Sequence, residues 1–110
     1  CKDEKQIDML TALYGSGPAY YVFFNEIINN AFLNMGFNKK DTILYTNNLM
    51  LGTSKLIQEE PKAEKLLRSI ASKGGTTEAA LTQLKKNRVD ALINKAIKQA
   101  YKKSRKILLK

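Results

Sequence analysis

Residues 69–84, SIASKGGTTEAALTQL, contain the strongest candidate for a binding site in this chain. Gly74 and Gly75 permit backbone angles that other residues avoid, and Thr76 or Thr77 can cap the helix that the following apolar pattern predicts. The N–H groups of a glycine turn and the positive end of a helix dipole together favour a carboxylate or phosphate. The same residues also suit a plain turn between two helices, so the motif alone leaves both interpretations open.

The residue content excludes several kinds of chemistry. The 110 residues include no histidine and one cysteine, Cys1. They therefore offer neither a zinc site nor a Ser/His or Cys/His nucleophile, and no internal disulfide can form. Carboxylates remain, but no pair of them stands out, so we assign no catalytic residue and no metal ligand. A chain of this length predicts a single domain.

The net charge of +9 belongs to the last part of the chain. Residues 85–110 hold ten Lys/Arg and one acid, Asp90, which gives +9, whereas residues 1–84 hold nine of each sign. Such a helix could follow nucleic-acid phosphates. Its apolar residues nevertheless recur at helical spacing, which places the lysines on an opposite, solvated face, and we do not expect nucleic acid as a partner. These apolar residues are Val89, Leu92, Ile93, Ala96, Ile97, Ala100, Tyr101 and Ile107.

The hydrophobic periodicity predicts an all-α fold of about six helices. The first covers 3–13 and ends at the Gly-Ser-Gly-Pro sequence of 15–18, and the second covers 18–35. Asn38 with Asp41 predicts the cap of a third helix over 39–58. The fourth begins at 60–61 and stops at the glycines, the fifth covers 76–84, and the sixth opens near Asn87.

Two of these helices are almost free of charge. Glu26 is the only charged residue between Gly15 and Asn38, and Lys55 is the only one from 42 to 58. Apolar faces of this size normally mark a subunit interface, so we expect an obligate oligomer, most simply a two-fold homodimer with helices 18–35 and 39–58 at its centre. A compact monomeric bundle is the alternative. We expect neither signal peptide nor membrane span, and a cytoplasmic location.

Two motifs resemble a known family: TALYGSGPAY at 11–20 and SIASKGGTTEAALTQL at 69–84, with LGTSKL at 51–56 between them. They are similar to the C-terminal, dimerisation half of pyrroline-5-carboxylate reductase, the NAD(P)H-dependent enzyme that forms proline in the last step of its synthesis. The resemblance covers essentially the whole chain. It implies an all-α domain that interlaces with a second copy and supplies the floor of an active site.

The resemblance also implies roles for the glycine loop. Gly74, Gly75, Thr76 and Thr77 would contact the carboxylate of a small imino-acid substrate, and the Ser72 hydroxyl would lie near its ring. Lys73 stands where the family more often has proline, which leaves the shape of the turn open. An acid that the family carries ahead of the fourth helix corresponds to either Glu59 or Glu60.

The other half of such an active site is a Rossmann domain, which residues 1–110 do not contain. No Gly-x-Gly-x-x-Gly sequence follows a strand pattern here. We therefore expect a C-terminal dimerisation and substrate-binding domain whose NAD(P)H is bound mainly by an absent N-terminal domain, and which is inactive alone. The alternatives are a stand-alone basic helical module, for dimerisation or for nucleic-acid binding.

Overall fold

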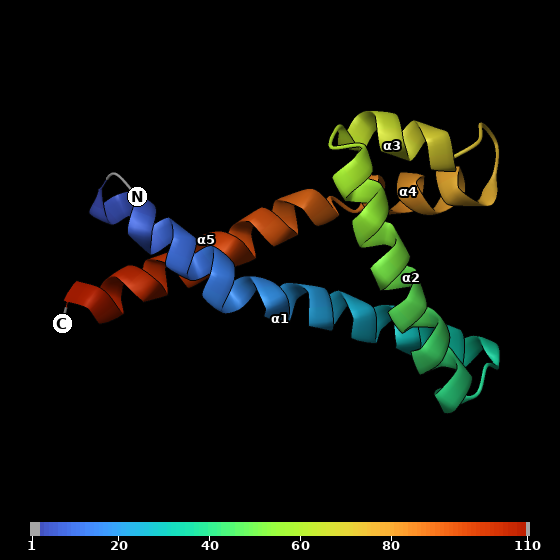
Figure 1. Ribbon diagram of the computed structural model, residues 1–110, viewed down its shortest axis with the longest axis horizontal. Helices are drawn as coiled ribbons and strands as arrows, with labels where there is room; N and C mark the ends of the chain where they lie inside the picture. The colour runs from blue at the N-terminus through green and yellow to red at the C-terminus, as the bar shows by residue number, and fades with distance from the viewer. Residues whose placement is uncertain (1–2, 110) are drawn as a thin grey trace. The chain divides into compact units, whose positions relative to one another are not determined.

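The computed structural model describes the backbone of residues 3–109 and the side chains of residues 3–105, so Cys1 lies outside it. This part of the chain forms five α-helices: α1 (Glu4–Met35), α2 (Lys39–Glu59), α3 (Ala63–Ile70), α4 (Thr76–Lys86) and α5 (Val89–Leu109) (Figure 1). No residue between 3 and 109 lies in a strand, and the predicted all-α class is confirmed. The chain divides into two compact units, residues 25–84 and residues 1–24 with 85–110, which are described separately.

The predicted break at residues 15–18 is wrong, because α1 runs through them as one helix of 32 residues with Pro18 inside it. Proline lacks an N–H, so the Tyr14 carbonyl loses its intrahelical donor, but the fixed φ of proline is itself helical. Gly15 and Gly17 do not take a positive φ and continue the helix. Helix propensity predicted that the helix would stop here, but the helix continues despite the unfavourable glycines and proline. The described part of the chain therefore has five helices rather than six.

The turn between α1 and α2 is built from local interactions. Gly36 has a φ of +115°, its N–H donates to the Leu33 carbonyl at 3.1 Å, and the Phe37 N–H donates to the Phe32 carbonyl at 3.2 Å. This is a Schellman motif, and its usual hydrophobic contact is present as the Phe32 and Phe37 rings, 5.8 Å apart. The predicted Asn38 cap of α2 is confirmed: Asn38 Oδ1 accepts the Asp41 N–H at 2.8 Å.

The side chains buried between α1 and α2 are polar. Asn29, Thr42 and Thr46 are 9%, 2% and 5% exposed. The Thr46 hydroxyl donates a hydrogen bond of 2.6 Å to Asn29 Oδ1, which joins the two helices. A buried hydrogen bond adds about 1 kcal/mol and, more importantly, penalises any packing that breaks it. The bond therefore fixes how α2 packs on the end of α1.

In the other unit, an ion pair joins the start of α1 to the end of α5. Asp8 is buried and its Oδ2 lies 3.7 Å from an Arg105 guanidinium nitrogen. Arg105 also donates to the Tyr101 hydroxyl at 3.2 Å, and this contact, with the charge of Asp8 as a smaller cause, raises the pKa of Arg105. Ala12 is the one buried apolar residue in the described part of the chain.

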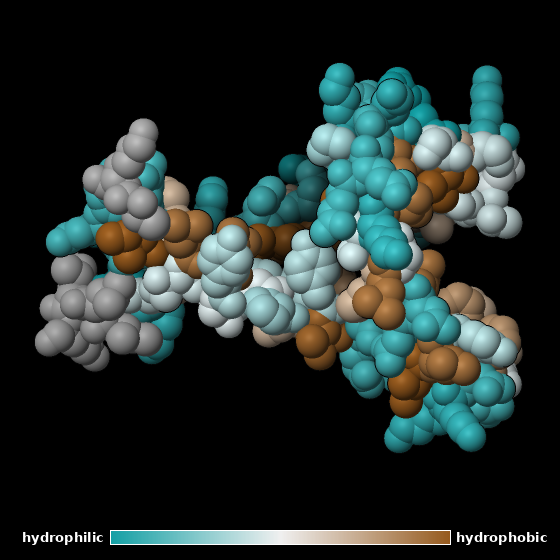
Figure 2. Space-filling model, viewed as in Figure 1, coloured by the Kyte–Doolittle hydropathy of each residue, from teal (hydrophilic) through white to brown (hydrophobic). Residues whose placement is uncertain are grey.

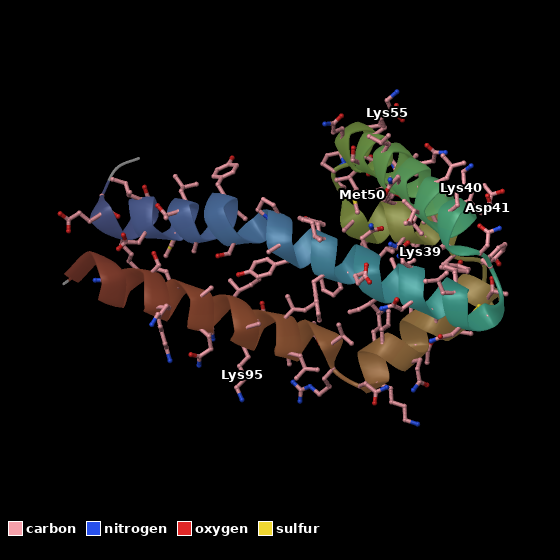
Figure 3. The ribbon with its side chains drawn as sticks, turned by 90° about the horizontal axis from the view of Figure 1, so that it is seen from below. Lys39, Lys40, Asp41, Met50, Lys55 and Lys95 are labelled. Atoms are coloured by element: carbon pink, nitrogen blue, oxygen red, sulfur yellow. The ribbon has the colours of Figure 1, made fainter. Side chains whose placement is uncertain are left out.

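The predicted apolar face of α5 is confirmed only in part. Val89, Ile93, Ala100 and Tyr101 are half-buried, but Leu92 is 63% exposed and Ile97 is 40% exposed. The side chain of Ile107 lies outside the described residues. The lysines of α5 up to Lys103 are exposed, and Lys95 points away from the first part of α1 (Figure 3). The basic side of α5 is thus solvated in this structure.

Large apolar side chains remain on the surface (Figure 2). Phe23, Met35 and Leu51 are 65%, 76% and 69% exposed. On α2 an exposed stripe recurs every seven residues, at Ile43, Met50 and Ile57. A stable monomer rarely exposes so much apolar area, so this surface is suited to cover by another molecule.

We expect Thr46→Val to lower the free energy of unfolding by about 1–3 kcal/mol, because valine keeps the shape but leaves the buried Asn29 Oδ1 without its donor. Urea denaturation at fixed protein concentration measures the change. Thr53→Val is the matched control, since Thr53 lies on the same helix and makes no side-chain hydrogen bond in the described residues. Equal stability of the two variants would show that the Asn29–Thr46 bond does not hold α1 and α2 together.

Candidate functional site

The glycine loop between α3 and α4 forms a tight turn. The Ser72 carbonyl accepts the Gly75 N–H at 3.0 Å, and Gly74 has a φ of +75°. A positive φ at the third residue of a hydrogen-bonded turn is the mark of type II, in which proline commonly takes the second position. Lys73 holds that second position here, so the turn keeps its type with a lysine in place of proline.

Gly75, not a threonine, caps α4. Its carbonyl accepts the Ala79 N–H at 3.2 Å, which makes it the N-cap residue and places Thr76 and Thr77 in the first turn. The predicted threonine cap is therefore wrong. A Cβ at Gly75 would overlap the Ser72 hydroxyl and lie 3.2 Å from the Ser72 carbonyl oxygen. A larger residue could therefore take the cap position only if the Ser72 hydroxyl rotated away and the Ser72 carbonyl shifted slightly.

The start of α4 presents backbone donors to solvent. The N–H groups of Thr76, Thr77 and Glu78 have no backbone acceptor in the described residues, as expected for a first helical turn. Thr76 and Glu78 are exposed, and Thr77 is half-buried. Together with the helix dipole, these donors favour an anion. The five residues proposed from the sequence thus lie next to these donors: Ser72, Gly74 and Gly75 in the loop, and Thr76 and Thr77 in the first turn of α4.

A contact of Glu78 was not predicted. Its Oε2 accepts the Gly74 N–H at 3.2 Å, so a carboxylate of the chain already lies on the loop. Glu78 is the third residue of α4, the position from which an acidic side chain reaches back to the residues before a helix. That spacing was the signal available in the sequence.

The two acids ahead of α3 differ in their surroundings. Glu59 is the last residue of α2 and is exposed, whereas Glu60 is half-buried and its N–H donates to the Leu56 carbonyl at 2.9 Å. Glu60 Oε1 is buried and has no hydrogen-bond partner in the described residues. A buried carboxylate oxygen without a donor is costly, so Glu60 is the better candidate for a ligand contact.

No three side chains of the metal-ligating types gather within the described residues. None of the helices in this part of the chain has the length and hydropathy needed to cross a membrane.

Comparison with known proteins identifies the family. Residues 4–107 match the family described as pyrroline-5-carboxylate reductase dimerisation. The chain belongs to this family. It is 36% identical over 105 residues to pyrroline-5-carboxylate reductase 1 of Bacillus subtilis, a match that covers 94% of this chain and 35% of that protein. The Pseudomonas aeruginosa reductase is 33% identical over 103 residues, which cover 93% of this chain and 38% of the relative.

Solved structures agree with membership of the pyrroline-5-carboxylate reductase family. A Coxiella burnetii pyrroline-5-carboxylate reductase superposes with a TM-score of 0.89 at 31% identity, over 96% of this chain and 40% of the other. The Plasmodium falciparum pyrroline carboxylate reductase, solved with NADP bound, gives 0.86 at 28% identity, over 93% and 39%. The resemblance inferred from the two motifs is confirmed. The chain spans little more than a third of its relatives' length.

We expect Lys73→Pro to raise the free energy of unfolding by about 0.4–1 kcal/mol, because proline at the second position of a type II turn fixes φ and restricts the unfolded chain. Lys73→Ala, which removes the same side chain without fixing φ, is the control and should leave stability within about 0.5 kcal/mol. Thermal and urea unfolding measure both. A destabilised Lys73→Pro variant would contradict the type II assignment.

Proposed function

We propose that this chain is the dimerisation and substrate-binding part of a pyrroline-5-carboxylate reductase, which reduces 1-pyrroline-5-carboxylate to L-proline with NAD(P)H. The match over residues 4–107 is the observation that carries the proposal. The activity is that of the whole reductase, and residues 1–110 alone are expected to be inactive. The exposed basic side of α5 has no aromatic residues interleaved for stacking on bases, so a nucleic-acid role is not favoured.

The chain's part in the reaction is to hold and orient the substrate. Reduction of a cyclic C=N bond needs a hydride, which the nicotinamide supplies when bound, and a fixed orientation of the ring. The N–H groups of Thr76 and Thr77 and the Thr77 hydroxyl would donate to the substrate carboxylate. Ser72 would place its hydroxyl beside the ring. Gripping the carboxylate in this way sets which ring face receives the hydride.

The described residues do not fit the dinucleotide itself. A pyrophosphate is normally held where a strand leads through a Gly-x-Gly-x-x-Gly turn into a helix, and residues 3–109 contain no strand. We therefore place the binding of NAD(P)H mainly outside residues 1–110. Of the two acids ahead of α3, we assign the substrate-side role to Glu60, because its buried Oε1 has no partner.

The homodimer is proposed to form through residues 18–35 and 39–58. The apolar stripe of Ile43, Met50 and Ile57 is 42%, 42% and 54% exposed, and a two-fold partner would cover it. A different side of α2 is polar: Asn48 and Lys55 are exposed there, and Lys55 points outward from the helix (Figure 3). The side of α2 that carries Lys55 thus accommodates a charge, whereas the stripe of Ile43, Met50 and Ile57 carries none.

Met50→Lys tests this interface. We expect it to weaken dimerisation at least tenfold, about 1.4 kcal/mol, because the ammonium group must be desolvated on the stripe. Sedimentation velocity across a dilution series measures the dissociation constant. Asn48→Lys adds the same charge to the polar side of α2 and should leave the constant unchanged. Equal effects of the two lysines would count against the stripe as the interface.

Thr77→Ala tests the carboxylate role. In amide NMR titrations of the 110-residue chain, we expect L-proline to shift signals of residues 72–78, and the variant to bind it about tenfold more weakly because it loses a hydrogen bond to a charged group. Thr82→Ala, farther along α4, is the control and should bind like the wild type. The carboxylate role is overturned if saturating proline shifts none of these signals in the wild-type chain.

A further inference from the structure

Glu78 places one of the chain's own carboxylates on the loop that is proposed to hold the substrate. Its Oε2 accepts the Gly74 N–H at 3.2 Å, and its own N–H is one of the donors at the start of α4. Glu78 is exposed, so the side chain is free to turn toward solvent when another group arrives. No lysine or arginine among the described residues forms an ion pair with it.

We infer that Glu78 determines the affinity of this loop for anionic substrates, because its carboxylate competes with the substrate carboxylate for the donors around Gly74 and the start of α4. The inference rests on the proposed function. Gly75 donates to the Ser72 carbonyl and contributes no donor, so the available N–H groups are those of Gly74, Thr76, Thr77 and Glu78. Two carboxylates beside these few donors repel each other.

A purely structural role for Glu78 predicts the opposite effect on binding. An acid in the first turn stabilises a helix through the dipole and, here, through its bond to Gly74. If that were its whole contribution, removing the charge would loosen the turn and weaken ligand binding. Competition instead predicts that removing the charge makes binding tighter while the chain becomes no more stable. The sign of the change in affinity therefore distinguishes the two roles.

Glu78→Gln is the informative variant, because glutamine still accepts a hydrogen bond from Gly74 but carries no charge. Glu64→Gln is the matched control: Glu64 is also exposed in the first turn of a helix, α3, but does not contact the loop. Amide NMR titrations of the 110-residue chain with L-proline measure the affinity. L-prolinamide, which lacks the carboxylate, is the control ligand, and thermal unfolding reports stability.

We expect Glu78→Gln to bind L-proline three- to tenfold more tightly than the wild type. The difference between the two dissociation constants should become smaller as salt is added, because salt screens the repulsion. Binding of L-prolinamide should be unchanged, and Glu64→Gln should behave like the wild type. Unchanged or weaker proline binding by Glu78→Gln overturns competition while leaving the proposed function in place. If proline shifts no loop signal in either chain, both the proposed function and the role of Glu78 are overturned.

Discussion

The constraint on which this structure depends is that one copy of the chain cannot cover its own apolar side chains. Ala12 is the single buried apolar residue in the described part, while residues as large as Phe23 and Met35 are mostly exposed. Burial of apolar area is the main favourable term in folding, so a single copy leaves part of that term unrealised while these side chains stay exposed. Within the protomer, polar contacts decide the geometry instead: Asn29 with Thr46 in one unit, and Asp8 with Arg105 in the other. Directional contacts of this kind add little net stability but specify one arrangement, which an assembling surface needs.

What the sequence predicted well is what is encoded locally. The Asn38 cap and the helices on either side of Gly36 follow from residues within one turn of each other, and the structure has them. The predicted break at Pro18 fails for the same reason: local propensity is a weak prior, and a helix of 32 residues can absorb one missing hydrogen bond. The burial of Thr42 and Thr46 rather than a neighbouring leucine could not be predicted, because it depends on which side of α2 meets α1.

The structure of the glycine loop accounts for some of the residues in its motif but not for others. Gly74 is required by its positive φ and Gly75 by the absence of room for a Cβ beside Ser72, so both glycines are accounted for by the turn alone. The hydroxyls of Thr76 and Thr77 are not, since neither caps α4 nor has a hydrogen-bond partner in the described residues. Residue types predicted a glycine turn leading into a helix, but not that Gly75 would be the cap or that Glu78 would reach back to Gly74. Those outcomes depend on backbone angles and side-chain geometry that residue types do not specify.

The glycine loop is held in place by the two helices that flank it, α3 and α4. Neither helix contains a fully buried residue in the described structure. In a single copy, α3 and α4 therefore make few of the apolar contacts that keep a helix in a rigid position. The turn from Ser72 to Gly75 is fixed by its own hydrogen bond and therefore keeps its shape wherever these helices lie. A substrate-binding loop must also be held to within a fraction of an ångström relative to the atom that it presents for reaction. Local turn chemistry thus gives the loop its donors, whereas only packing that covers α3 and α4 can hold those donors in a fixed position.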